Sequence, residues 1–290
     1  MRIANHGYKA QSAMEYLMTY GWAILIIAVV LVALFSLGVF SSANLGPRAN
    51  AGACQVVRNV ESVTLQGQCQ GELPRYVANF QGNSNVDVVP GQLPNGQSPR
   101  TMTAWVYPTA APSSYNNLGI FYYGGNNCNP DGAVFGLILQ KGSLYFWGSC
   151  SDVPTNFSIP QDTWSFVAVT YNSPTLGIAY NNKMQYYSAS IDTCNSITCT
   201  SAYIGGNSNW WGDTFSGQLA NVQIYNASLS ANEVEQLYLE GIGGAPIDPL
   251  HIVGWWPLNG NAQDYSGNGN HGNSTEVSYT SAWTSGYTTP

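Results

Sequence analysis

The sequence predicts a mainly β protein, in which an antiparallel sandwich follows one apolar helix near the N-terminus. Residues 17–40 form a long apolar run, and beyond residue 43 short alternating segments are separated by Gly, Asn and Pro. Only 8% of the residues are charged and 44% are hydrophobic, which is typical of a compact, turn-rich body rather than of a disordered one. Many short strands with turn signals between them favour a sandwich.

The apolar run predicts the N-terminal helix. Its 24 residues, from Leu17 to Phe40, would span about 36 Å as a helix and so exceed the roughly 30 Å of a bilayer core. Glu15 stands two residues before this run. Because a carboxylate that enters a bilayer costs roughly 2.5–3.5 kcal/mol, we expect Glu15 to have a partner and a function that a plain anchor would not need.

The residues before the run carry a first resemblance. Lys9, Ala10 and Gln11 are followed, after three more residues, by Glu15. This segment resembles the class III signal peptide of archaeal type IV pilin-like proteins. The resemblance implies that a prepilin peptidase cuts between Ala10 and Gln11 and that the apolar helix remains in the mature chain. An uncut anchor, or a conventional signal cut within residues 41–44, remains an alternative.

The same resemblance gives Glu15 a role in assembly. Cleavage would leave the amino group of Gln11 as a cation near the bilayer, and buried charges persist when they are paired. We expect Glu15 of a neighbouring subunit to pair with it as the pilus assembly machinery packs the helices into a homopolymer. Alternatively, Glu15 lies at the membrane interface without such a role.

Charge constrains the location and the partners. The leader carries Arg2 and Lys9, so its removal leaves 6 basic and 15 acidic residues. Such a chain does not attract nucleic acid. Basic residues before the helix favour a cytoplasmic N-terminus, which places the rest of the protein outside the membrane. We therefore expect a cell-surface or extracellular filament protein, membrane-inserted before assembly.

Cysteines and glycosylation motifs agree with an external location. The six cysteines fall into three local pairs, and we expect three local disulfides: Cys54 with Cys69, Cys128 with Cys150, and Cys194 with Cys199. Closing a loop of about 15 residues stabilises a fold by about 3 kcal/mol. Free core thiols are the alternative. Three Asn-X-Ser/Thr motifs make Asn156, Asn226 and Asn273 candidate glycosylation sites.

Alternating segments predict the strands. We expect strands at residues 76–80, 86–89, 102–107, 119–123, 134–139, 144–147, 164–171, 176–180 and 218–225. Ser230 and Glu233 form a capping box that opens one short helix over residues 231–239, and Gly241 ends it.

These segments carry a second resemblance, to laminin G-like (concanavalin A-like) jelly-roll domains. The matching segments are residues 79–82, 102–108, 163–170, 202–206 and, most characteristic, Phe215–Asn226. The resemblance covers about residues 75–290 and implies a jelly-roll head. The predicted organisation is a leader (1–10), a hydrophobic helix (11–42), a linker with a Cys54/Cys69 hairpin (43–74) and the head (75–290).

One part of the head is out of order. Residues 253–258 and 264–272 are similar to the segment that opens such domains, but here they close the chain. This order has two explanations. The domain is circularly permuted, which is tolerated where termini are close, or its C-terminal segment completes a neighbouring subunit's sheet.

The sequence does not predict an enzyme. Retaining glycoside hydrolysis needs two carboxyl groups about 5–5.5 Å apart, which on one strand requires acids at alternate positions. No predicted strand has them, and Glu233 and Glu235 point apart on the helix. Because the fold hosts glucanases, lectins and structural modules, it does not decide the function.

Aromatic residues are the candidates for a glycan site. Trp210, Trp211 and Asp213 lie in a loop between predicted strands, where large apolar rings either pack or bind a ligand. Trp147, Tyr122 and Tyr123 are candidates to extend this patch. Packing against the helix or a subunit interface is the alternative.

A calcium site is a second candidate, although the fold requires no cofactor. Asp264, Ser266 and Asn268 present oxygens at alternate positions in a glycine-rich segment, which suits Ca²⁺. The alternative is a turn in which Asp264 accepts hydrogen bonds from backbone amides.

These observations favour a structural subunit of an archaeal type IV pilus-like surface filament, with a helix in the filament core and a jelly-roll head exposed for adhesion. The alternative is a membrane-anchored carbohydrate-binding adhesin that does not polymerise.

Overall fold

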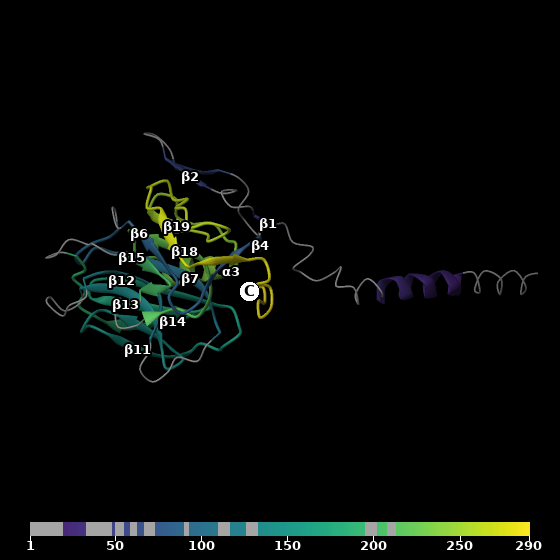
Figure 1. The fold of residues 1–290 in the computed structure, drawn as a ribbon, viewed down its shortest axis with the longest axis horizontal. Coiled ribbons are helices and arrows are strands. Elements are labelled where there is room, and N and C mark those ends of the chain that lie inside the picture. Colours follow the sequence, from purple (N-terminus) through teal and green to yellow (C-terminus); the bar gives the residue numbers. More distant parts are fainter. Residues whose placement is uncertain are drawn as a thin grey trace, which may run out of the picture. The chain divides into compact units, whose positions relative to one another are not determined.

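The computed structural model describes ten segments of the chain: residues 20–32, 48–49, 55–58, 63–66, 73–89, 93–109, 117–125, 133–194, 202–207 and 213–290. The chain divides into two compact units, Met1–Gly46 and Pro47–Pro290 (Figure 1). The second unit therefore begins before the predicted head, because it includes most of the predicted linker.

In the first unit, residues 20–32 are helical and each of them is exposed. Within the part of the chain that the structure describes, no helix is long and apolar enough to cross a membrane. Ala10, Gln11 and Glu15 lie outside the described residues, so cleavage and pairing remain predictions.

The second unit contains two antiparallel sheets, which confirms the predicted mainly β sandwich. The seven-stranded sheet has the order β11 (Val153–Ser158), β10 (Ser143–Trp147), β9 (Val134–Gln140), β8 (Leu118–Gly124), β15 (Ala202–Ile204), β6 (Asn85–Val88) and β20 (Gly272–Thr275). The second sheet has the order β14 (Lys183–Ser188), β13 (Thr175–Tyr180), β12 (Ser165–Asn172), β7 (Arg100–Pro108), β18 (Gly217–Tyr225), β5 (Val77–Phe80) and β21 (Ser278–Thr280), and β19 (Ile252–Trp256) also pairs with β18.

Three smaller pairings accompany the sandwich. β1 (Arg48–Ala49) runs parallel to β4 (Leu73–Pro74), and β16 (Gly206–Asn207) pairs with β17 (Asp213–Thr214). β2 (Gln55–Arg58) and β3 (Val63–Gln66) form an antiparallel hairpin. This hairpin lies between Cys54 and Cys69 in the sequence, but both cysteines lie outside the described residues.

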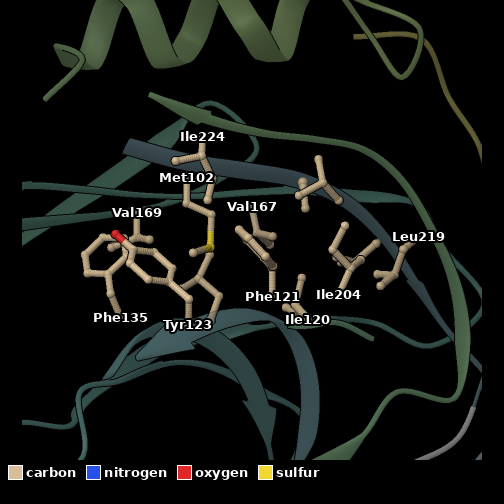
Figure 2. Packing of buried hydrophobic residues seen from close by; sticks show 14 of the residues in the cluster. Met102, Ile120, Phe121, Tyr123, Phe135, Val167, Val169, Ile204, Leu219 and Ile224 are labelled. Carbon is tan, nitrogen blue, oxygen red and sulfur yellow. The ribbon is translucent and has the colours of Figure 1, made fainter. Parts of the chain in front are cut away.

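The main core fills the space between the two sheets. Phe121 and Phe135 extend from the seven-stranded sheet toward Met102 and Val169 of the other sheet (Figure 2). Tyr123 belongs to this core, where its hydroxyl donates a hydrogen bond to the Pro94 carbonyl at 2.8 Å. The prediction that Tyr123 extends a surface patch is therefore wrong, because strand alternation turns it inward.

A second core covers the outer face of the other sheet. Helix α3 (Ala231–Leu239) places Val234 and Leu237 there, and the Tyr238 ring stacks on Trp105 at 5.9 Å. The predicted capping box is confirmed: the Ser230 hydroxyl accepts from the Glu233 amide, and the Glu233 carboxylate accepts from the Ser230 amide.

The C-terminal segment completes the sandwich of its own chain. β19 pairs with β18, β20 with β6, and β21 with β5. Further along, the Trp283 indole donates to the Pro74 carbonyl at 3.2 Å. In the structure the out-of-order segment therefore pairs within its own chain, as a circularly permuted domain would, and not with a neighbouring subunit.

Candidate functional site

One row of residues crosses the seven-stranded sheet from strand to strand. Each member lies directly opposite the next in the strand register, in the order Trp147, Gly136, Tyr122, Tyr203, Asp87 and Asn273. We call these six residues the outer row. They come from β10, β9, β8, β15, β6 and β20, so the sheet brings together residues from distant parts of the sequence.

The outer row faces away from the main core. Successive side chains of a strand point to opposite faces of a sheet. Val86 and Val88, which flank Asp87, both belong to the main core, and so do Ala202 and Ile204, which flank Tyr203. The side chains of Asp87 and Tyr203 therefore point outward, and the remaining members share this face because directly opposed residues do.

Three aromatic rings form one half of the outer row. The Tyr122 ring lies 4.9 Å from the Trp147 ring at 73° and 5.7 Å from the Tyr203 ring at 55°, measured between centroids. Tyr122 is buried, while Trp147 and Tyr203 are half-buried. The Tyr122 ring therefore packs between the other two rings, and part of Trp147 and part of Tyr203 remain accessible to solvent.

Gly136 allows the rings to meet. It lies between Trp147 and Tyr122 in the outer row, and a Cβ atom at this position would be 2.2 Å from the Tyr122 Cβ. Since real Cβ contacts are never that short, a side chain at Gly136 would displace Tyr122. The contact between the rings therefore depends on a glycine, which has no Cβ, at position 136.

Polar groups form the other half of the outer row. Asp87 is exposed, and its Oδ1 accepts a hydrogen bond from the side-chain Nδ2 of Asn85 at 3.0 Å. Partial burial raises the pKa of the Asp87 carboxyl, and the hydrogen bond from Asn85 offsets part of this change. Asn273 lies opposite Asp87 on β20 and is also exposed.

The predicted glycan patch is only partly tested. Trp210 and Trp211 lie outside the described residues, and Asp213 begins β17 opposite Asn207. Two predicted additions, Trp147 and Tyr122, do lie in the outer row. Sequence reasoning missed Tyr203 and Asp87, although each stands between two apolar residues of a strand, which is the pattern of an outward-facing side chain.

Asp264 has a structural role in its loop. Its Oδ1 accepts from the Trp255 and Ser266 amides at 2.9 and 2.8 Å, and its Oδ2 accepts from the Ser266 hydroxyl and the Asn270 amide at 2.9 Å each. Asn268 donates to the Val253 carbonyl at 3.1 Å. These bonds tie the loop to β19, as the alternative to the calcium prediction expected. Among the described residues no cluster of three or more His, Cys, Asp or Glu could hold a metal.

The structure describes all three predicted glycosylation sites and two of the six cysteines predicted to form disulfides. Asn156, Asn226 and Asn273 are all exposed, as glycosylation would require. Cys150 and Cys194 are each disulfide-bonded. Their predicted partners, Cys128 and Cys199, lie outside the described residues, so the pairing stays a prediction.

Comparison with known families identifies the fold. Residues 80–235, more than half of the chain, match the Laminin_G_3 family of the concanavalin A-like lectin/glucanases superfamily. The chain therefore belongs to this superfamily, which confirms the predicted laminin G-like resemblance. A search among curated proteins finds no match.

Solved structures share the fold at low sequence identity. A candidate carbohydrate-binding protein from Bacteroides ovatus is 17% identical with a TM-score of 0.56, and the match covers 77% of this chain and 65% of that one. A SAP-like pentraxin from Limulus polyphemus is 13% identical (TM-score 0.49; 71% of this chain and 94% of that chain), and CBM40 of the IT-sialidase from Ruminococcus gnavus is 12% identical (TM-score 0.44; 56% and 96%). The chain thus spans less than two thirds of the length of the first structure.

Proposed function

We propose that the head is a carbohydrate-binding domain, which a pilin-like N-terminal segment displays at the cell surface. The outer row is the observation that carries this proposal. It combines aromatic rings that are partly accessible with exposed polar side chains, on a face opposite the main core. Ligand sites commonly combine apolar and aromatic surface with a few polar groups that fix orientation.

The chemistry of the outer row suits a sugar. One face of a pyranose ring carries C–H groups with partial positive charge, which pack on the negative face of an aromatic ring such as Trp147 or Tyr203. Sugar hydroxyls donate to a carboxylate and exchange hydrogen bonds with an amide, and Asp87 and Asn273 supply these groups. This role requires an Asn273 side chain that carries no N-linked glycan. Aromatic and polar groups lie side by side in the outer row, as a sugar requires.

Binding fits the outer row better than hydrolysis does. Glycoside hydrolysis uses two carboxyl groups, about 5–5.5 Å apart in retaining enzymes and about 6.5–9.5 Å apart in inverting ones. Asp87 is the one carboxylic acid among the six residues of the outer row. We therefore propose a binding protein and not an enzyme.

A glycan array with the purified chain in detergent tests the proposal. We expect one or more glycans to bind, and Trp147→Ala to weaken binding by about thirtyfold, as for a central aromatic contact worth roughly 2 kcal/mol. Tyr186→Ala is the matched control, because Tyr186 is an exposed aromatic residue on β14 of the other sheet. An array without any hit, or equal losses in the two variants, would contradict the proposal.

A filament role is the second candidate, and residues 20–32 favour it. Their apolar side chains are exposed, among them Trp22 at 66% and Ile24 at 65%. Such a surface needs a membrane or neighbouring helices to cover it. Together with the motif from Lys9 to Glu15, it supports cleavage by prepilin peptidase and self-association through the pilus assembly machinery.

N-terminal sequencing of the chain in sheared surface filaments tests the filament role. We expect the mature chain to begin at Gln11, and Glu15→Ala to abolish filaments while the head still folds. Recovery of the chain only from dispersed membranes would leave the carbohydrate-binding adhesin as the remaining candidate.

A further inference from the structure

We propose that Asp87 makes the outer row selective, so that it binds uncharged and amino-sugar oligosaccharides and rejects those built from sugar acids. This selectivity rests on the proposed carbohydrate-binding function and specifies its ligand class.

The length of the outer row indicates an oligosaccharide. Neighbouring strands lie about 4.8 Å apart, so the five steps from Trp147 to Asn273 span about 24 Å. A sugar that stacks on Trp147 cannot also contact Asp87, because four strand spacings, about 19 Å, separate these two residues. A chain that crosses the strands reaches both halves.

Carboxylates accompany both halves of the outer row. Asp87 lies in the polar half. Near the aromatic half, the Asp152 carboxylate accepts from the Gly148 amide at 2.8 Å, next to Trp147. Its charge contributes, after burial, to a raised pKa of Tyr145, which lies two residues from Trp147 on β10. A ligand that lies along the outer row is therefore near a carboxylate at its aromatic half (Asp152) and at its polar half (Asp87).

Among the described residues, the strands that carry the outer row supply no basic side chain to balance these carboxylates. The seven described strands of this sheet contain neither Lys nor Arg. Lys141 lies in the turn that joins β9 and β10. Ser143 follows this turn, and Trp147 lies four residues further along β10, about 13 Å away. Since this distance exceeds the screening length of about 8 Å at physiological ionic strength, the charge of Lys141 is largely screened at Trp147.

The consequence for a ligand follows from its charge. The carboxylate of a sugar acid that contacts Asp87 would place two like charges together without a cation between them, and such a contact is repulsive. A hydroxyl or an ammonium group at the same position donates a hydrogen bond to Asp87. Asn85 and Asn273 add neutral donors and acceptors that favour neither charge.

Titration calorimetry of the full chain in detergent tests this selectivity. The probes are three pentasaccharides that share a β-1,4-linked gluco backbone: N-acetylglucosamine (neutral), glucosamine (cationic) and glucuronic acid (anionic). We expect the first two to bind, and the anionic pentasaccharide to bind at least fivefold more weakly than the neutral one. Fivefold is roughly the effect of one charge contact at about 4 Å in water.

Two variants isolate the contribution of Asp87. Asp87→Asn is expected to reduce the preference for the cationic over the anionic pentasaccharide by about fivefold or more. Asp162→Asn is the matched control, since it removes the same charge from an exposed turn between β11 and β12 and should leave the preference unchanged.

The outcomes separate the two proposals. If the anionic pentasaccharide binds as tightly as the neutral one and Trp147→Ala weakens both, the selectivity is wrong and carbohydrate binding stands. If Asp87→Asn and Asp162→Asn change the preference equally, the overall charge acts and the role of Asp87 is wrong. If none of the probes binds and a glycan array has no hit, carbohydrate binding fails, and the selectivity fails with it.

Discussion

Replacing Trp283 with alanine would test whether the C-terminal segment completes its own sandwich. The Trp283 side chain is 1% exposed, its indole donates to the Pro74 carbonyl, and its ring lies 5.6 Å from Tyr287 and 6.2 Å from Trp164. Removal of a fully buried tryptophan costs about 3–5 kcal/mol. For a domain of this size we expect the melting temperature to fall by about 6–20 °C.

Trp283→Phe is the informative partner of this variant. It keeps an aromatic ring in the cluster but removes the indole donor, so the Pro74 carbonyl loses one hydrogen bond. Because the buried Pro74 carbonyl is left without this donor, we expect a loss of about 1–3 kcal/mol, smaller than for Trp283→Ala. The main-chain carbonyl of residue 283, which accepts from the Trp164 indole at 2.8 Å, remains in both variants.

The assay is thermal unfolding followed by near-ultraviolet circular dichroism at several protein concentrations. A melting temperature for Trp283→Ala within 1 °C of the wild type, by order of magnitude a loss below about 0.5 kcal/mol, would refute the reasoning. A strong dependence of the wild-type melting temperature on concentration would instead indicate that a neighbouring subunit supplies the segment.

Three further outcomes are expected. Gly136→Ala should lower the free energy of unfolding by about 1–3 kcal/mol in urea titrations, because the new Cβ would displace Tyr122, and unchanged stability would show that the outer row relaxes freely. Partial desolvation, opposed in part by the hydrogen bond from Asn85, raises the pKa of the exposed Asp87 carboxyl, so the folded state binds this proton more tightly than the unfolded state does. Above pH 3.8, melts should show the wild type losing stability relative to Asp87→Asn as pH rises through the folded pKa, and the opposite slope would contradict this. Ser230→Ala should cost about 0.5–2 kcal/mol by chemical denaturation because it removes the N-cap of α3, and a neutral result would mean that packing alone holds the helix.

Local patterns in the sequence predicted the short helix and nine of the strands, while β11, β14, β15, β19, β20 and β21 were not predicted. The capping box of Ser230 and Glu233 gave the helix its start, and alternation gave strands within a residue or two of those in the sandwich. These signals depend on near neighbours in the chain, so they are readable without knowledge of the fold.

The site was less predictable, for a physical reason. Phe121, Tyr122 and Tyr123 form an uninterrupted aromatic run, and only the position of the core decides which of them faces outward. The outer row also depends on pairings between distant strands, such as Asp87 with Tyr203 and Asn273. Register of this kind is set by the assembled sheets and not by local sequence.

The intramolecular pairing of the C-terminal strands has a consequence for biogenesis. β5, β6 and β18 precede β19, β20 and β21 in the sequence, and each gains a hydrogen-bonded neighbour only when these last strands arrive. Until β19 has been synthesised, the sandwich lacks three of its strands and the core residue Trp256, and the last of these strands is complete only at Thr280. The order of strands thus delays completion of the two sheets until β19, β20 and β21 have all been made.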